Sequence, residues 1–226
     1  MKRILIISGG HFNLEFAKKY IKTLSFDKVF AVDQGLEYTE QLGLSPDYIV
    51  GDFDSVNENI LKQYMKKEAD LNHSLIERYP EKKDVTDTEL AVQKAIGEKP
   101  DEIVLLSATG TRIDHSIMNM GLLIPIAEAG IKGYIIDEYN RIQLLNAENT
   151  KKCCIKKTEQ YGRYLSFVPM SKIVEGVTMS GVMYPLNQVT VYQGSSLTVS
   201  NQIVDHWAKI EIQSGLALII ESKDDK

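Results

Sequence analysis

Two aspartates separated by a single residue are the clearest sign of chemistry in this 226-residue sequence. Asp52 and Asp54 follow Gly51, which itself follows the apolar run of residues 48–50. If that run ends a buried strand and the chain stays extended, both carboxylates point to one side and Phe53 packs on the other. Two carboxylates that face one way repel each other unless a cation lies between them, and Mg²⁺ completed by phosphate oxygens fits such ligands. D-x-D is also common in solvated acidic turns, so other motifs must decide between the two interpretations.

Two more acidic segments lie further along the chain. Asp33 is followed closely by Gly35, so the segment offers a carboxylate and a glycine that lets a ligand approach the backbone. Asp84, Thr86 and Asp87 stand at the start of a predicted helix, where acids and hydroxyls are often plain capping residues. A cap at Asp84 or Thr86 is therefore the ordinary interpretation, and a functional role for Asp87 needs support from elsewhere.

A fourth segment, S-A-T-G-T-R-I-D-H at residues 107–115, separates a strongly apolar run from a long helical pattern. Small residues around Thr109, followed by Arg112, favour a phosphate-binding loop, since backbone N–H groups and a guanidinium both suit phosphoryl oxygens. Asp114 and His115 lie in the same segment. Acidic or glycine-rich loops thus follow four predicted strands, and loops at the carboxyl edge of one sheet predict a site for Mg²⁺ and a polyphosphate.

The elements that position these loops alternate in the first part of the chain. Apolar runs predict strands at residues 3–7, 28–32, 48–50, 74–77 and 102–106, and helical patterns cover 13–24, 36–42, 57–67, 85–96 and 113–129. Asn13 is the predicted cap of the first helix. This alternation predicts an α/β domain, a mostly parallel open sheet with helices on both faces, over residues 1–146.

Beyond residue 146 the pattern changes to short β-rich segments separated by Gly, Asn, Ser and Pro. Strands are predicted at residues 151–156, 162–168, 173–179, 188–191, 195–199, 208–212 and 217–221. Regular short strands with turn signals predict a C-terminal antiparallel β-sandwich domain over residues 147–226.

Composition excludes several classes of protein. The net charge is −5 and no basic stripe is present, which argues against nucleic-acid binding. No apolar stretch is long enough to cross a membrane, and the first apolar run ends at Ser8 as a strand does. Cys153 and Cys154 are adjacent, a spacing that suggests neither a disulfide framework nor a metal site. A reducing cytoplasm is the expected location.

Four motifs in order carry a family resemblance: A-V-D-Q-G, L-G-L-S-P-D-Y-I-V-G-D-F-D-S, K-K-D-V-T-D-T-E-L-A and S-A-T-G-T-R-I-D-H-S-I-M-N-M. Together they resemble the thiamin pyrophosphokinases, and the later G-S-S-L-T-V-S-N and G-L-A-L-I-I resemble that family's thiamin-binding domain. The resemblance implies transfer of the β,γ-diphosphoryl group of ATP to the hydroxyl of thiamin, with release of AMP. It also implies Mg²⁺ and a homodimer whose thiamin pocket is shared between subunits.

The resemblance also implies roles for particular residues. The metal ligands would be Asp52, Asp54 and Asp87, and the catalytic set would add Asp114 on the substrate side. The nucleotide would be bound by Asp33, Gly35, Asp84, Thr109, Arg112 and His115, and thiamin by Ser200 and Asn201. Either Asp87 or Asp114 would take the proton of the hydroxyl. The number of metal ions stays open.

One departure concerns the acceptor pocket. Ile203 stands where many members of the family have an aromatic residue, and the single tryptophan, Trp207, is interpreted as a core strand residue. The residue that stacks on thiamin therefore stays open.

Three alternatives remain at this point. A pyrophosphokinase acting on 6-hydroxymethylpterin would need the same ATP half and a different acceptor pocket. A sugar-nucleotide transferase would use the D-x-D motif but would not explain residues 84–87, and a nucleotide sensor would not need so many acids.

Overall fold

The computed structural model describes residues 1–53, 56–69, 76–78 and 84–224. The chain divides into two compact units, Met1–Leu122 with Ile135–Glu138, and Leu123–Tyr134 with Tyr139–Lys226. The division into domains of 1–146 and 147–226 was drawn from composition, and it stays a prediction. None of the helices in the described part of the chain is long and apolar enough to cross a membrane.

The first unit is built on a sheet with strand order β4-β3-β2-β1-β5-β6, in which β1 to β5 are parallel. Its strands are β1 (Arg3–Ile7), β2 (Lys28–Val32), β3 (Tyr48–Gly51), β4 (Ile76–Arg78), β5 (Glu102–Leu106) and the carboxyl end of β6 (Lys132–Ile136). β1 is central, with Leu5 aligned to Val29 on one side and to Val104 on the other. Residues 4–7 are fully buried because both faces of the sheet are covered, which explains their unbroken apolar sequence.

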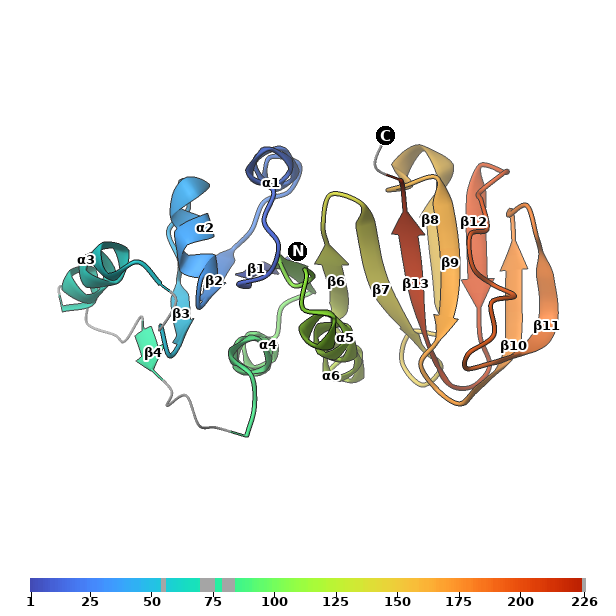
Figure 1. The fold of residues 1–226 in the computed structure, drawn as a ribbon. Coiled ribbons are helices and arrows are strands. Elements are labelled where there is room, and N and C mark those ends of the chain that lie inside the picture. Colours follow the sequence, from blue (N-terminus) through green and yellow to red (C-terminus); the bar gives the residue numbers. More distant parts are fainter. Residues whose placement is uncertain (54–55, 70–75, 79–83, 225–226) are drawn as a thin grey trace. The chain divides into compact units, whose positions relative to one another are not determined.

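Helices cover both faces of this sheet, α1 and α2 on one and α4 and α5 on the other (Figure 1). The helices are α1 (Leu14–Ile21), α2 (Gly35–Gln41), α3 (Glu58–Ala69), α4 (Asp87–Gly97) and α5 (Ile113–Gly121). The predicted cap at Asn13 is confirmed, since its side chain accepts a hydrogen bond from the Phe16 N–H at 3.0 Å. Thr86 rather than Asp84 caps α4, accepting from the Glu89 N–H at 3.2 Å.

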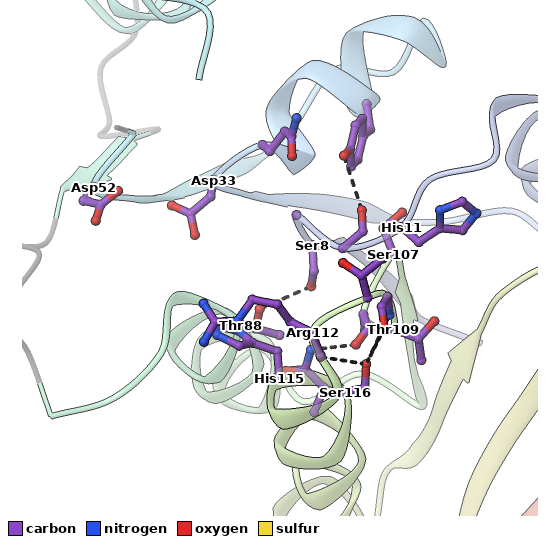
Figure 2. A pocket seen from close by; sticks show the side chains of 18 residues that line it. Ser8, His11, Asp33, Asp52, Thr88, Ser107, Thr109, Arg112, His115 and Ser116 are labelled. Atoms are coloured by element: carbon purple, nitrogen blue, oxygen red, sulfur yellow. Dashed lines mark hydrogen bonds between the residues drawn. The ribbon is translucent and has the colours of Figure 1, made fainter. Parts of the chain in front are cut away.

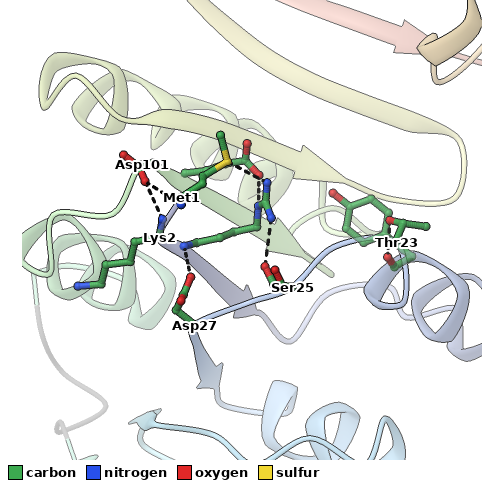
Figure 3. Close-up of polar contacts among 9 residues, drawn as sticks. Met1, Lys2, Thr23, Ser25, Asp27 and Asp101 are labelled. Carbon is green, nitrogen blue, oxygen red and sulfur yellow. Dashed lines mark hydrogen bonds and ion pairs between the residues drawn. The ribbon is translucent and has the colours of Figure 1, made fainter.

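The amino edge of the sheet is closed by polar contacts (Figure 3). Asp101 accepts a hydrogen bond from the Lys2 N–H at 2.6 Å, and Asp27 accepts from the Arg3 N–H at 2.7 Å. The Arg3 guanidinium also pairs with Glu102. The two aspartates thus give hydrogen-bond acceptors to backbone N–H groups at the start of β1.

The second unit is a sandwich of two antiparallel sheets, with strand orders β7-β13-β9 and β11-β10-β12-β8. Its elements are α6 (Leu123–Glu128), β7 (Asn140–Asn146), β8 (Lys152–Lys156), η1 (Lys157–Glu159), β9 (Tyr164–Pro169), β10 (Ile173–Ser180), β11 (Leu186–Tyr192), β12 (Trp207–Glu211) and β13 (Leu216–Ser222). Inward side chains of both sheets, among them Phe167, Ile219, Val177 and Ile210, form one buried core. The predicted fold class is thereby confirmed.

Two predicted elements are wrong in detail, and two strands were not predicted. The helix expected at 113–129 is two helices, α5 and α6, separated at Leu122, and the strands β6 and β7 that follow were not predicted. Residues 195–199 are not a strand, although the sequence alternates there. The Thr198 hydroxyl donates to the Phe167 carbonyl at 2.6 Å, which holds this segment as a turn against β9.

Candidate active site

A cavity of about 640 Å³ opens at the carboxyl ends of the parallel strands in the first unit (Figure 2). Its walls come from residues 8–11 after β1, residues 33–34 after β2, Asp52 after β3 and residues 107–112 after β5. Side chains of α2, α4 and α5 complete the lining, namely Tyr38, Thr88, His115, Ser116 and Asn119. Ligands of open α/β sheets bind at this edge, so the cavity is the candidate active site.

The turns after β1 and β5 lie against each other in this wall. The Gly10 N–H donates to the Ser107 carbonyl at 2.7 Å, and the His11 N–H donates to the Thr109 carbonyl at 2.8 Å. A Cβ at Gly10 would collide with both carbonyl oxygens, so only glycine permits this approach. The two turns therefore form one continuous surface.

Two carboxylates form the acidic wall of the cavity. The loops that carry Asp33 and Asp52 are in contact, because the Asp33 N–H donates to the Val50 carbonyl at 3.0 Å and a Cβ at Gly51 would collide with the Asp33 carboxylate. Both side chains point to the same side of the sheet edge (Figure 2). Carboxylate oxygens are the ligands that Mg²⁺ takes, so this wall fits the predicted ion in donor type.

The complete set of predicted metal ligands cannot be assembled from the described residues. Asp54 lies outside them, and within the described ranges no three His, Cys, Asp or Glu side chains are grouped as a metal site. Asp87 occupies the first turn of α4, where its neighbour Thr88 rather than Asp87 itself lines the cavity. Asp52, Asp54 and Asp87 therefore stay predicted ligands.

The loop around Asp52 differs from its expected conformation. Phe53 has a φ of 63°, so the backbone turns there instead of remaining extended, and side-chain alternation does not apply. The prediction that Phe53 packs the loop down is confirmed, since Phe53 is buried in a core cluster with Ile49 and Tyr64.

Arg112 projects from the loop that follows β5. Its guanidinium donates to Asp114, with Nη2 at 2.6 Å from Oδ2 and Nε at 3.3 Å from Oδ1. This hydrogen-bonded pairing lowers the pKa of Asp114 and raises that of Arg112. Both side chains are well exposed, at 71% and 61%, and exposed ion pairs contribute little to stability. Arg112 can therefore exchange Asp114 for a phosphate at little cost.

Side chains of α5 shape the same loop from within. The Ser116 hydroxyl accepts from the Gly110 N–H at 3.1 Å and donates to the Arg112 carbonyl at 3.2 Å. Asn119 donates to the Ala108 carbonyl at 2.7 Å. Ser116 and Asn119 are three residues apart and so lie on one face of the helix. This spacing is visible in the sequence, but the two residues were not among the predicted site residues.

The structure brings together five of the predicted site residues in the cavity wall: Asp33, Asp52, Thr109, Arg112 and His115. The others that it describes in this unit, Gly35, Asp84, Asp87 and Asp114, do not line the cavity. Gly35 has a packing requirement instead, since a Cβ there would collide with the Ile7 carbonyl oxygen.

The turn of residues 8–11 also belongs to this wall, with Tyr38 and Thr88, and none of these residues was predicted from the sequence. The signal was present, because S-G-G-H after a buried strand repeats the strand-then-glycine pattern used for the other loops. Tyr38 carries no comparable signal: it stacks on Phe12 with ring centroids 4.2 Å apart, and its hydroxyl reaches the Gly10 carbonyl at 3.3 Å.

The predicted thiamin residues lie in the second unit. Ser200 is exposed with a φ of 59°, whereas Asn201 is buried and its amide both accepts from the Tyr184 N–H and donates to the Tyr184 carbonyl. Ile203 is buried as well. The interpretation of Trp207 as a core residue is wrong, since its side chain is 44% exposed on β12.

Fold and cavity together define an α/β protein with a candidate ligand site at its sheet edge and a separate β-sandwich. Comparison with protein families narrows this class. The family model "Thiamin pyrophosphokinase, catalytic domain" matches residues 19–135, and "Thiamin pyrophosphokinase, vitamin B1 binding domain" matches residues 152–217.

Individual proteins agree with the family models. The thiamine pyrophosphokinase of Bacillus subtilis (strain 168) is 33% identical over 224 residues, 99% of this chain and 100% of that protein. A crystal structure of the Bacillus subtilis enzyme covers 99% of this chain and 100% of its own at a TM-score of 0.84 and 29% identity. The crystal structure of the Geobacillus thermodenitrificans enzyme covers 99% of each chain at a TM-score of 0.80 and 26% identity. The chain belongs to the thiamin pyrophosphokinase family, the kinases that transfer a diphosphate group to thiamin.

Proposed function

We propose that the cavity of the first unit binds ATP. The β,γ-diphosphoryl group of ATP is transferred to the hydroxyl of thiamin, and AMP is released. One observation carries this assignment: the acidic wall of Asp33 and Asp52 and the Arg112 loop face a single cavity of about 640 Å³. That volume lies in the range of small-molecule and cofactor sites. The cavity belongs to the part of the chain that resembles the family's catalytic domain.

The residues of the chain act mainly by positioning and charge. Arg112 moves its planar fork from Asp114 to the phosphate oxygens, where two parallel hydrogen bonds hold the group in line for attack. Asp52, Asp54 and Asp87 would hold Mg²⁺, and Asp33 would face the nucleotide. When bound, the ion neutralises charge on the phosphoryl oxygens. Asp87 or Asp114 accepts the proton of the hydroxyl.

The reaction is tested directly by incubating the protein with ATP and Mg²⁺ and either thiamin or 6-hydroxymethylpterin. We expect AMP and thiamin diphosphate in equal amounts, and no AMP above background with the pterin. Chromatography with mass detection identifies both products. Diphosphorylated pterin, or ADP in place of AMP, would contradict the proposal.

Arg112→Lys should raise the Michaelis constant for ATP and lower turnover, by about tenfold in kcat/KM. Lysine keeps the positive charge but loses the planar fork that binds two phosphate oxygens at once. Steady-state kinetics with ATP varied at saturating thiamin measure the effect, and Lys62→Arg, at an exposed position of α3, serves as a matched control. Kinetic constants equal to those of the parent would remove Arg112 from the phosphate site.

We also propose a homodimer in which each site is completed by the second unit of the partner chain. A dimer that mixes an Asp52→Asn chain with a Ser200→Arg chain should then regain one working site of two, while each parental homodimer has none. Shared sites complement in this way only if their halves come from different chains.

Mixed dimers are prepared with two affinity tags and verified by mass before assay, with unfolding temperatures checked for both variants. Verified mixed dimers as inactive as both homodimers would show that each site is built within one chain. A monomer that is active at working concentration would exclude the dimer.

Two assignments complete the proposal. The cytoplasm is the proposed location, in keeping with the free thiols of Cys153 and Cys154. The catalytic domain is proposed as residues 1–146 and the thiamin-binding domain as residues 147–226.

A further inference from the structure

Two consecutive carboxylates, Asp137 and Glu138, follow β6 directly and reach the cavity wall from behind its lining residues. Asp137 Oδ2 accepts a hydrogen bond from the Thr109 hydroxyl at 2.9 Å. Glu138 Oε1 lies 3.0 Å from His11 Nε2. Neither carboxylate lines the cavity itself, while Thr109 and His11 both do.

The two residues held in this way are also bonded to each other. The His11 N–H donates to the Thr109 carbonyl at 2.8 Å, which joins the turn after β1 to the turn after β5. The end of β6 thus holds the side chains of two residues whose backbones are already joined. Hydrogen bonds therefore link the segments that follow β1, β5 and β6 behind one wall of the cavity.

Charge and burial make these contacts stronger than ordinary surface hydrogen bonds. Glu138 is only 13% exposed although His11 is 57% exposed, and Asp137 is half-buried. Hydrogen bonds to an ionised acceptor are stronger than those between neutral groups, and burial of the acceptor limits competition from water.

The contact with Asp137 also restricts what Thr109 can do. A threonine hydroxyl has one hydrogen, and in this structure that hydrogen is directed to Asp137. Thr109 therefore has no hydroxyl hydrogen left to donate to a phosphate oxygen. Its side chain fixes the loop that carries Arg112, three residues further on.

We infer that Asp137 and Glu138 are positioning residues for the nucleotide site: they hold Thr109 and His11, and through them the two turns against which the phosphates bind. This inference rests on the proposed function, in which the cavity takes ATP. It assigns the Thr109 side chain to Asp137 rather than to the phosphates.

A double-mutant cycle tests the inference. Asp137→Ala and Thr109→Val should each raise the Kd and the Michaelis constant for ATP about tenfold, since each removes the same charge-assisted hydrogen bond. The Kd for ATP of the double variant should be no higher than that of the single variant that binds ATP less tightly, because the interaction can be lost only once. The Michaelis constant for thiamin should stay unchanged. Asp137→Asn should recover part of the loss, since its amide oxygen still accepts from the hydroxyl but carries no charge.

The second carboxylate is tested in the same way. Glu138→Ala should raise the Kd for ATP, and Glu138→Gln should recover part of the loss, since its amide oxygen still accepts from the ring N–H of His11 but carries no charge. The matched control is Asp101→Ala, which removes an exposed carboxylate from the opposite, amino end of β5. Its ATP affinity should equal that of the parent.

The double variant distinguishes a Thr109 that acts with Asp137 from a Thr109 that contacts the phosphates directly. Effects of Asp137→Ala and Thr109→Val that multiply in the double variant would show Thr109 acting on the phosphates independently, and would overturn the inference. So would parental ATP affinity in the single variants. If Asp137→Ala does not fold, Asp137→Ser replaces it in the cycle. A parent protein that binds ATP but releases no AMP with thiamin would refute the proposed function and leave the binding cycle readable.

Discussion

Asp52→Asn should lower the turnover number by roughly 10²- to 10³-fold with ATP, Mg²⁺ and thiamin all saturating, the usual loss when one preorganised electrostatic group is removed from an active site. Asp52 lines the same wall of the cavity as Asp33. Asparagine has nearly the same shape but no charge, so it weakens the hold on a hard divalent cation without opening a space in the loop.

Asp52→Asn should not lower the unfolding temperature, although it lowers activity. Two like charges at one edge of a sheet destabilise the free protein, so replacing one of them should leave the unfolding temperature unchanged or slightly higher. Activity lost together with folding would instead indicate a structural role for Asp52.

Titration calorimetry supplies a readout that does not depend on turnover. The parent should bind ATP more tightly with Mg²⁺ than without it, and Asp52→Asn should lose most of this difference. Asp101→Asn, at the far edge of the sheet, is the control and should match the parent in both assays. Near-parental turnover of Asp52→Asn at saturating Mg²⁺ would exclude Asp52 as a metal ligand.

The location of the site was predictable from sequence because the strands that set it are unusually clear. After a charged first residue, β1 and β5 are each an unbroken apolar run, as strands buried on both faces must be. Once such strands are parallel, every loop at their carboxyl ends meets at one edge. Asp33, Asp52 and Arg112 could therefore be grouped before any coordinates, although they lie far apart in the chain.

The features that were not predicted are local backbone conformations and side chains that contact the lining residues rather than the cavity itself. The φ of 63° at Phe53 cannot be read from its residue type, since positive φ is uncommon outside glycine. Asp137 and Glu138 were missed because β6, with its exposed first residue and an internal glycine, lacks the apolar run of the central strands. The pairing of Arg112 with Asp114 depends on where the turn aims two side chains.

The second unit contains a buried ion pair that joins β7 to β13. Glu221 is 1% exposed and lies directly opposite Arg141 in the register of the two strands. The Arg141 guanidinium donates to both carboxylate oxygens, at 2.7 and 2.8 Å, and the Tyr161 N–H donates to Glu221 at 2.9 Å. The charge of Glu221 is thus compensated by hydrogen bonds from two sides, which is what makes its burial tolerable.

Arg141→Met should lower the free energy of unfolding of the second unit by about 3–5 kcal/mol, because it leaves the Glu221 carboxylate buried without its cation. The double variant Arg141→Met with Glu221→Leu should recover most of that loss, since apolar side chains of similar volume replace such pairs at little cost. Fluorescence of Trp207, the single tryptophan, follows urea unfolding of this unit.

The control is Lys152→Met, which breaks the exposed Lys152–Glu211 pair between β8 and β12 in the same unit and should cost no more than about 1 kcal/mol. If Arg141→Met costs no more than this control, the buried pair contributes no more than a surface one. If the double variant is as unstable as Arg141→Met alone, the loss does not come from an uncompensated charge, because Glu221→Leu removes that charge. It then comes from packing around the arginine stem or from the Tyr161 N–H, which loses its acceptor in the double variant.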